Sequence, residues 1–222
     1  MNETFTLTSR AAANDLSVLL GRAVRLDDAA AVRLVADSGV LAVYAAVLTP
    51  RGLLDRGPTV LGLRTFALSA GGFDAVVPVR SLQARVDAAL ELLDDGPVEL
   101  RAPASVSTIV WAGITPPRGG WQRMADLSAS MFSAAARAGI DEVAAAIPEG
   151  TGEQIVHRVR SEVWGRPLPD AAHVPAGAAF ALEALGFLGD DAVQQYAAGP
   201  WLRLSTTRGH VLIKQSAWTL GG

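Results

Sequence analysis

The segment 111–121 carries the residues best suited to bind a small anion. It reads Trp-Ala-Gly-Ile-Thr-Pro-Pro-Arg-Gly-Gly-Trp, so an arginine and two glycines lie between two tryptophans. Free backbone N–H groups at the start of a helix attract anions, and a guanidinium adds a two-pronged donor. The alternative is a linker whose tryptophans pack into the core, because Gly and Pro commonly mark loops. The candidate ligand-binding residues of this segment are Trp111, Arg118, Gly119, Gly120 and Trp121.

A second candidate lies on the polar face of a predicted helix. Glu153, His157 and Ser161 follow one another every four residues, so they line one side of that helix. A carboxylate beside an imidazole can tune a general base, and His157 therefore joins the candidate ligand-binding residues. The spacing is common, and a solvated helix face is the favoured explanation. We assign no catalytic residue.

The sequence contains no motif for metal binding or for a catalytic nucleophile. The chain has no cysteine, and its three histidines, His157, His173 and His210, lie far apart. They form no paired metal-binding motif. The sequence also has no GxSxG, P-loop or GxGxxG motif. We therefore expect no metal, no cofactor and no disulfide, and we favour a non-enzymatic protein while leaving catalysis open.

The composition indicates a folded, weakly acidic protein. Hydrophobic residues make up 50% of the 222 residues and charged residues 18%, which argues against disorder. The net charge of -3 gives no reason to expect nucleic acid or an anionic membrane as the main partner. The longest apolar run, 40–48, is less than half of the ~20 residues that a membrane helix needs. With no secretory signal at the N-terminus, we expect a cytoplasmic location and no membrane partner.

Four apolar runs of strand length dominate the first half of the chain. Turn residues separate them, which predicts a four-stranded meander. The turn at 37–39 suits a tight hairpin because Gly39 accepts a positive φ. The second run is apolar on both faces, as is typical of a sheet covered on both sides, either by the rest of the chain or by another subunit. The runs are 31–36, 40–48, 60–68 and 75–79.

Helices are predicted beside the sheet and through the second half. Ser9 is a good N-cap for a helix that Gly21 would end, followed by a short strand at 23–26. Apolar residues at helical spacing predict four further helices, and a shorter helical piece is predicted at 141–147. A hairpin of two strands, 201–207 and 210–215, closes the chain. The further predicted helices are 81–93, 121–138, 151–164 and 175–185.

Proline and glycine divide the chain near its middle. The two prolines and three glycines of 111–121 can continue neither a helix nor a central strand, so we place a domain boundary there. The prediction is an α+β meander domain over 1–113, a linker over 114–119 and a helical domain over 120–222. The fold class is thus α+β: a mainly antiparallel sheet with packed helices, followed by a mainly helical part that ends in a β-hairpin.

A winged-helix nucleic-acid binder is a further alternative, because helices precede a C-terminal hairpin. Its recognition helix would be 175–185, which has no Arg or Lys and carries Glu183. Contacts to phosphates and base edges need basic or amide side chains. The proline-bearing gap before this helix is also too long for a helix-turn-helix. Nucleic acid is therefore a disfavoured partner.

Three segments, 111–121, 176–189 and 201–214, resemble stretches of a protein family of high-GC bacteria with no assigned function. The middle segment reads Ala-Gly-Ala-Ala-Phe-Ala-Leu-Glu-Ala-Leu-Gly-Phe-Leu-Gly. The likeness extends over half of the chain. It implies no substrate, cofactor or active-site residue.

The sequence therefore predicts a non-enzymatic binding or assembly module that forms a homo-oligomer. The motivating feature is the apolar surface on both faces of the sheet, which needs a cover. The alternative is a binding protein or enzyme for a small anionic ligand, with the candidate residues around a pocket at the domain boundary.

Overall fold

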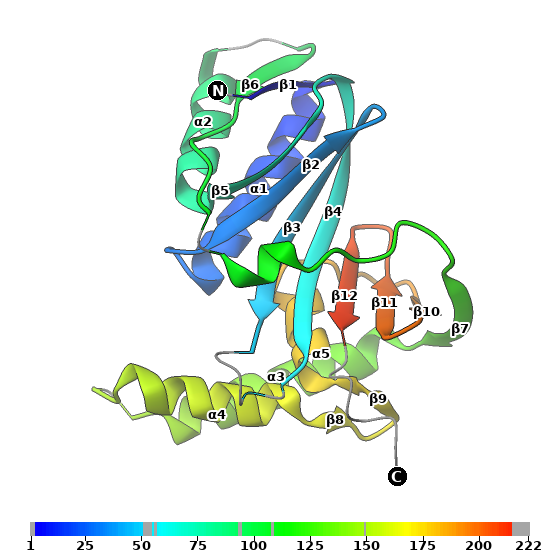
Figure 1. Cartoon of the computed structure of the whole chain (residues 1–222). Coiled ribbons are helices and arrows are strands. Elements are labelled where there is room, and N and C mark those ends of the chain that lie inside the picture. Colours follow the sequence, from blue (N-terminus) through cyan, green and yellow to red (C-terminus); the bar gives the residue numbers. More distant parts are fainter. Residues whose placement is uncertain are drawn as a thin grey trace. The chain divides into compact units, whose positions relative to one another are not determined.

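A computed structural model describes residues 3–50, 55, 57–92, 95–107, 109–148 and 150–214. The chain divides into two compact units. The first is Met1–Ala46 with Leu63–Thr115, and the second is Val47–Gly62 with Pro116–Gly222. Both units contain helices and mainly antiparallel strands (Figure 1), which confirms the predicted α+β class. The predicted linker at 114–119 stays a prediction.

The first unit combines two helices with an antiparallel sheet. The strand order is β5-β2-β3-β4, and β1 pairs with both β4 and β6. Its elements are β1 (Thr4–Leu7), α1 (Arg10–Leu26), β2 (Ala31–Asp37), β3 (Val40–Leu48), β4 (Thr59–Ala70), β5 (Phe73–Pro78), α2 (Val79–Leu92), β6 (Val98–Arg101) and the 3-10 turn η1 (Val110–Gly113).

Helix α1 begins where the sequence predicts and ends later. The Ser9 side chain accepts a hydrogen bond from the Ala12 N–H at 3.1 Å, which is the N-cap arrangement. The helix continues past Gly21, so the predicted end there and the strand at 23–26 are wrong. A Cβ on Gly21 would lie only 3.2 Å from the side-chain nitrogen of Gln83 on α2. The glycine thus permits close packing of two helices instead of ending one.

The predicted meander is correct for three strands and wrong for the fourth. Strands β2 and β3 form the predicted hairpin, in which Ser38 and Gly39 have φ values of 51° and 77°. Strand β5 pairs with β2 instead of β4. The edge of β4 is occupied by β1, where Leu7 lies opposite Leu68, so a fourth meander strand cannot pair there.

The two faces of this sheet differ in burial. On β3, Leu41, Val43 and Ala45 are buried, whereas Tyr44 and Ala46 on the opposite face are only half-buried. The alternation of burial follows the two-residue period of a strand. The predicted cover on both faces is therefore partial in the described chain.

The second unit contains three helices and a second group of antiparallel strands. The strand order is β4-β12-β11-β10-β7. Of β4, residues 59–62 belong to this second unit. Strands β8 and β9 pair separately. Its further elements are β7 (Gln122–Leu127), α3 (Ala129–Ala146), α4 (Glu153–Gly165), β8 (Pro167–Leu168), β9 (Ala171–Pro175), α5 (Ala176–Ala184), β10 (Val193–Ala198), β11 (Trp201–Ser205) and β12 (His210–Lys214).

Two predictions for the second half are wrong. The helix expected over 121–138 begins only at Ala129, because 122–127 form strand β7, and it continues to Ala146. Helix α5 is buried along most of its length, so it cannot serve as the recognition helix of a winged helix, and that alternative is wrong. The C-terminal hairpin forms, but its first strand ends at Ser205 instead of residue 207, and residue 215 lies outside the described residues.

Trp164 joins the three helices of the second unit. Its ring stacks on Phe180 of α5, with centroids 4.5 Å apart and an interplanar angle of 16°. A Cβ on Gly139 of α3 would overlap the Trp164 ring. The glycine therefore lets α4 approach α3 closely. No helix in the described part of the chain has the length and hydropathy needed to cross a bilayer.

Candidate functional site

The predicted binding residues of segment 111–121 lie in different settings. Trp111 is half-buried in η1 of the first unit, where Arg33 Nη1 donates to the Ala112 carbonyl at 2.8 Å. A strand follows residue 121, so the helix N-terminus that motivated the anion site is not there. The ligand site stays a prediction. The exposed members, all in the second unit, are Arg118, Gly119 and Gly120.

Trp121 packs within the second unit. Its Nε1–H donates to the Pro117 carbonyl at 3.1 Å. The guanidinium of Arg203 lies 4.7 Å from the centroid of the Trp121 ring and 4.4 Å from that of the Tyr196 ring. An arginine in contact with two aromatic rings is a strong cation–π arrangement. This contact favours the linker alternative for Trp121, in which the tryptophan has a packing role.

Burial controls the charges in this cluster. Desolvation lowers the pKa of Arg203, and its Nε is buried without a hydrogen-bond partner among the described residues. The His210 Nδ1 lies 2.9 Å from the Ser205 Oγ. Burial, with the positive charge of Arg203 as a smaller cause, lowers the pKa of His210 below its ordinary value of 6.5. His210 is therefore neutral at pH 7.

His157 lies half-buried on α4, beside Ser161 as predicted. The Ser161 Oγ is 3.4 Å from the His157 Nδ1, as the interval of four residues predicts. A serine beside a histidine is the start of a nucleophile–base pair, but 3.4 Å is long for such a hydrogen bond. Within the described residues, no group of three His, Asp or Glu side chains could hold a metal ion.

Strand β7 is an exposed sheet edge that the sequence did not reveal. It is the last strand in the order of the second unit and pairs only with β10 among the described strands. Five of its six residues are exposed, and the apolar Met124 is 52% exposed. Arg123 Nη2 donates to both carboxylate oxygens of Asp126 at 2.8 Å. The edge thus offers unpaired backbone groups beside one apolar side chain.

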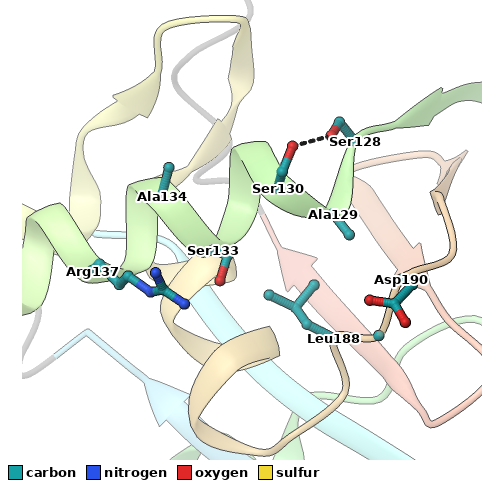
Figure 2. A pocket seen from close by; sticks show the side chains of 9 residues that line it. Ser128, Ala129, Ser130, Ser133, Ala134, Arg137, Leu188 and Asp190 are labelled. Atoms are coloured by element: carbon teal, nitrogen blue, oxygen red, sulfur yellow. Dashed lines mark hydrogen bonds between the residues drawn. The ribbon is translucent and has the colours of Figure 1, made fainter.

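The described part of the second unit also contains an open cavity of about 490 Å³ (Figure 2). Helix α3 forms one wall, and the loop after α5 forms the other. The Ser128 and Ser130 hydroxyls are 2.6 Å apart, and the Ser133 Oγ donates to Glu183 Oε2 at 3.1 Å. The lining residues are Ser128, Ala129, Ser130, Ser133, Ala134, Arg137, Leu188, Gly189 and Asp190.

Two family models cover most of the chain. The model described as "Domain of unknown function (DUF8010)" matches residues 1–112. The model described as "Domain of unknown function (DUF8185)" matches residues 116–218. A search of curated proteins finds no relative.

Solved structures with the same fold are DNA polymerase sliding clamps. The DnaN clamp (DNA polymerase III subunit beta) of Bartonella birtlesii, bound to griselimycin, is 16% identical with a TM-score of 0.51, over 99% of this chain and 66% of the clamp. A Pseudomonas aeruginosa clamp with ligand is 15% identical with a TM-score of 0.50, over 99% and 66%. The chain therefore spans just under two thirds of the length of these clamps, and at such identity the likeness concerns the fold alone.

Proposed function

This chain belongs to the family described as "Domain of unknown function (DUF8010)". We propose that it is a non-enzymatic, clamp-like assembly module that forms a closed homo-oligomer. The observation that carries the proposal is the exposed edge of β7. An open edge presents N–H and C=O groups that another strand can pair with. The clamp-like fold supports the same reading.

The partner strand is β6 in the first unit of another copy. Among the described strands, β6 pairs only with β1. The N–H of Ala102 donates to the Glu3 carbonyl at 2.8 Å, so by alternation the N–H of Glu99 points away from β1. β6 carries Glu99 and Arg101, and β7 carries Arg123 and Asp126, so each edge offers one charge of each sign.

Pairing between unlike edges continues from copy to copy, and it closes into a ring when the rotation between copies brings the two ends together. After β7 of one copy pairs with β6 of the next, the assembly still has one free edge of each kind. Copies then add head to tail until the ends meet. In β7 two residues, Met124 and Ala125, lie between the pairs that flank the single Gln195 of β10. Such a bulge guards an edge against unspecific pairing, so the partner strand must fit its register.

The proposal predicts that Met124→Glu dissociates the oligomer. The side chain is 52% exposed, so the charge has little effect on the fold but enters the contact between copies. Ile155→Glu on α4 is the matched control, because Ile155 is 56% exposed. Sedimentation velocity at micromolar concentration should give a monomer for the first variant and the wild-type oligomer for the second. A wild-type monomer, or an unchanged oligomer of the Met124 variant, contradicts the proposal.

A mixing experiment distinguishes unlike from like edges. Glu99→Pro removes an N–H at the outer edge of β6 without touching the β1 pairing. Each of the two variants keeps one intact edge, so an equimolar mixture of Met124→Glu and Glu99→Pro should stop at a dimer. If β7 pairs with β7, the Glu99→Pro variant alone forms dimers instead.

A second candidate function, contact with duplex DNA, is favoured by the charge of α1 and α2. These helices carry five arginines and three acidic residues, whereas the whole first unit has eight arginines and eleven acidic residues. Basic residues on helices can neutralise phosphates. Because solved structures of the same fold are DNA polymerase sliding clamps, DNA is the polyanion to test. The arginines are Arg10, Arg22, Arg25, Arg80 and Arg85.

The DNA candidate predicts salt-dependent binding that depends on α1. Fluorescence anisotropy with a labelled duplex should give an affinity that falls as salt rises. The double variant Arg22→Gln, Arg25→Gln should reduce the slope of log K against log salt by about 2. The double variant Arg158→Gln, Arg160→Gln on α4 is the control. No binding at about 50 mM salt, or equal slopes for both variants, removes this candidate.

A further inference from the structure

We propose that the cavity beside α3 binds a small zwitterion, with its carboxylate at Arg137 and its ammonium group at Asp190. The site lies within the second unit and does not depend on the oligomer proposed above. Figure 2 shows Arg137 and Asp190 toward opposite ends of the lining, with Ser133 and Leu188 between them. This separation of charge is the basis of the proposal.

The two charged side chains are available to a ligand. Arg137 and Asp190 are both exposed, and neither makes a hydrogen bond or ion pair with a described residue. In particular they form no salt bridge with each other, although both line the same cavity. Two opposite charges in one cavity without mutual pairing present a complementary pattern to a molecule that carries both.

The wall opposite α3 is held in place before any ligand arrives. Arg208 Nη1 donates to the Leu188 carbonyl at 2.9 Å, and Phe187 N–H donates to the Leu182 carbonyl at 2.8 Å. These bonds hold Phe187 and Leu188, which directly precede Gly189 and Asp190. A wall that is already ordered lowers the entropic cost of binding.

The lining excludes simpler ligands. An anion such as phosphate would meet Arg137 but also the carboxylate of Asp190, whereas a simple cation would face Arg137. The volume of about 490 Å³ lies in the range of small-molecule sites. Between the charges, Leu188 and Ala134 offer apolar contact to a short carbon chain. The ligand class is therefore an ammonium and a carboxylate joined by a short apolar linker.

An amino-acid length series tests the site. ω-Amino acids from 4-aminobutanoate to 8-aminooctanoate would be titrated into the full chain and followed by amide shifts of Ser133 and Leu188 in NMR spectra. We expect saturable binding with an optimum chain length, and binding of hexanoate and hexylamine that is weaker than that of 6-aminohexanoate by about tenfold. Absence of saturable binding, or equal binding of hexanoate or hexylamine, overturns the proposal.

Two variants assign the ends of the ligand. In Arg137→Gln, 6-aminohexanoate should bind no better than hexylamine, and in Asp190→Asn no better than hexanoate. Arg158→Gln and Asp170→Asn, exposed residues outside the cavity lining, are controls and should bind as the wild type does. Unchanged affinity in either cavity variant contradicts the assignment. Because all four side chains are exposed, thermal unfolding should be equal in all variants.

Discussion

Arg203 is a charge whose burial is offset by aromatic rings. Its guanidinium contacts Trp121 and Tyr196, while its Nε has no hydrogen-bond partner among the described residues. Removing a charge from water costs free energy, and the cation–π attraction of a ring face offsets part of this cost. The cluster thus ties residue 121, at the entry of β7, to strands β10 and β11. Trp121 is accordingly a residue whose replacement affects stability.

A double-mutant cycle measures this contact. We expect Trp121→Leu to lower the free energy of unfolding, and to lower it by about 1 kcal/mol less when Arg203 is Met, because the cation–π term is then already lost. Urea unfolding of the four proteins provides the values. Additive effects of the two changes would mean that the stacking contributes nothing.

His210 makes stability depend on pH. Its pKa is lowered in the folded state, so below its ordinary value of 6.5 the unfolded chain binds the proton more readily. Above pH 6.5 the neutral His210 does not lower the free energy of unfolding. As the pH falls below 6.5, the free energy of unfolding decreases, by at most about 1.4 kcal/mol per pH unit. Urea unfolding between pH 7.5 and 5 should show this fall, and His210→Gln should flatten it. Equal pH profiles for the two proteins would exclude His210 as the cause.

At the residue scale, the sequence alone predicts contacts between side chains of the same helix or strand. The pair His157–Ser161 could be predicted because helical spacing places residues four apart on one face. Arg203 and Tyr196 could not, since they face each other through the pairing of β10 with β11. That register is set by tertiary structure, and no local pattern encodes it.

At the scale of elements, Gly139 joins α3 to α4 because it has no side chain. A Cβ there would overlap the ring of Trp164, which is 3% exposed. Gly139→Ala should therefore lower the free energy of unfolding by about 1–3 kcal/mol, although alanine favours a helix by about 1 kcal/mol. Gly165→Ala at the end of α4 is the control, because a Cβ there has no neighbour within 4 Å. Calorimetry that found Gly139→Ala at least as stable as the control would contradict this packing.

Elements with strong local signals could be predicted, and those with mixed signals could not. Ser9 and the apolar stripe behind it predict the start of α1, and two turn residues predict the hairpin of β2 and β3. Strand β7 was missed because Met124, Leu127 and Met131 have helical spacing although a strand and a helix share them. The position of β5 was missed because β1, distant in sequence, occupies the edge of β4.

At the scale of the whole molecule, the division into units follows contacts that composition does not mark. The chain passes between units after Ala46, after Gly62 and after Thr115. The first two points lie inside β3 and β4, within the apolar stretches 40–48 and 60–63. Only the third coincides with a cluster of proline and glycine, the signal that a sequence-based boundary relies on.

Charge also differs between the units. The first unit has a net charge of -3, whereas the second has eleven basic and eleven acidic residues. Within the first unit, the excess of arginine on α1 and α2 contrasts with the acidity of the remaining residues. The DNA candidate therefore depends on these two helices and not on the total charge of the chain.

In the proposed assembly, copies of this chain join through unlike sheet edges. Sedimentation velocity of the untagged wild-type protein, from about 1 to 100 μM and paired with native mass spectrometry, tests it most directly. The account predicts a single oligomer whose subunit number stays constant as concentration rises, as expected of a closed ring. A monomer throughout this range, or a mass that grows continuously with concentration, would contradict it.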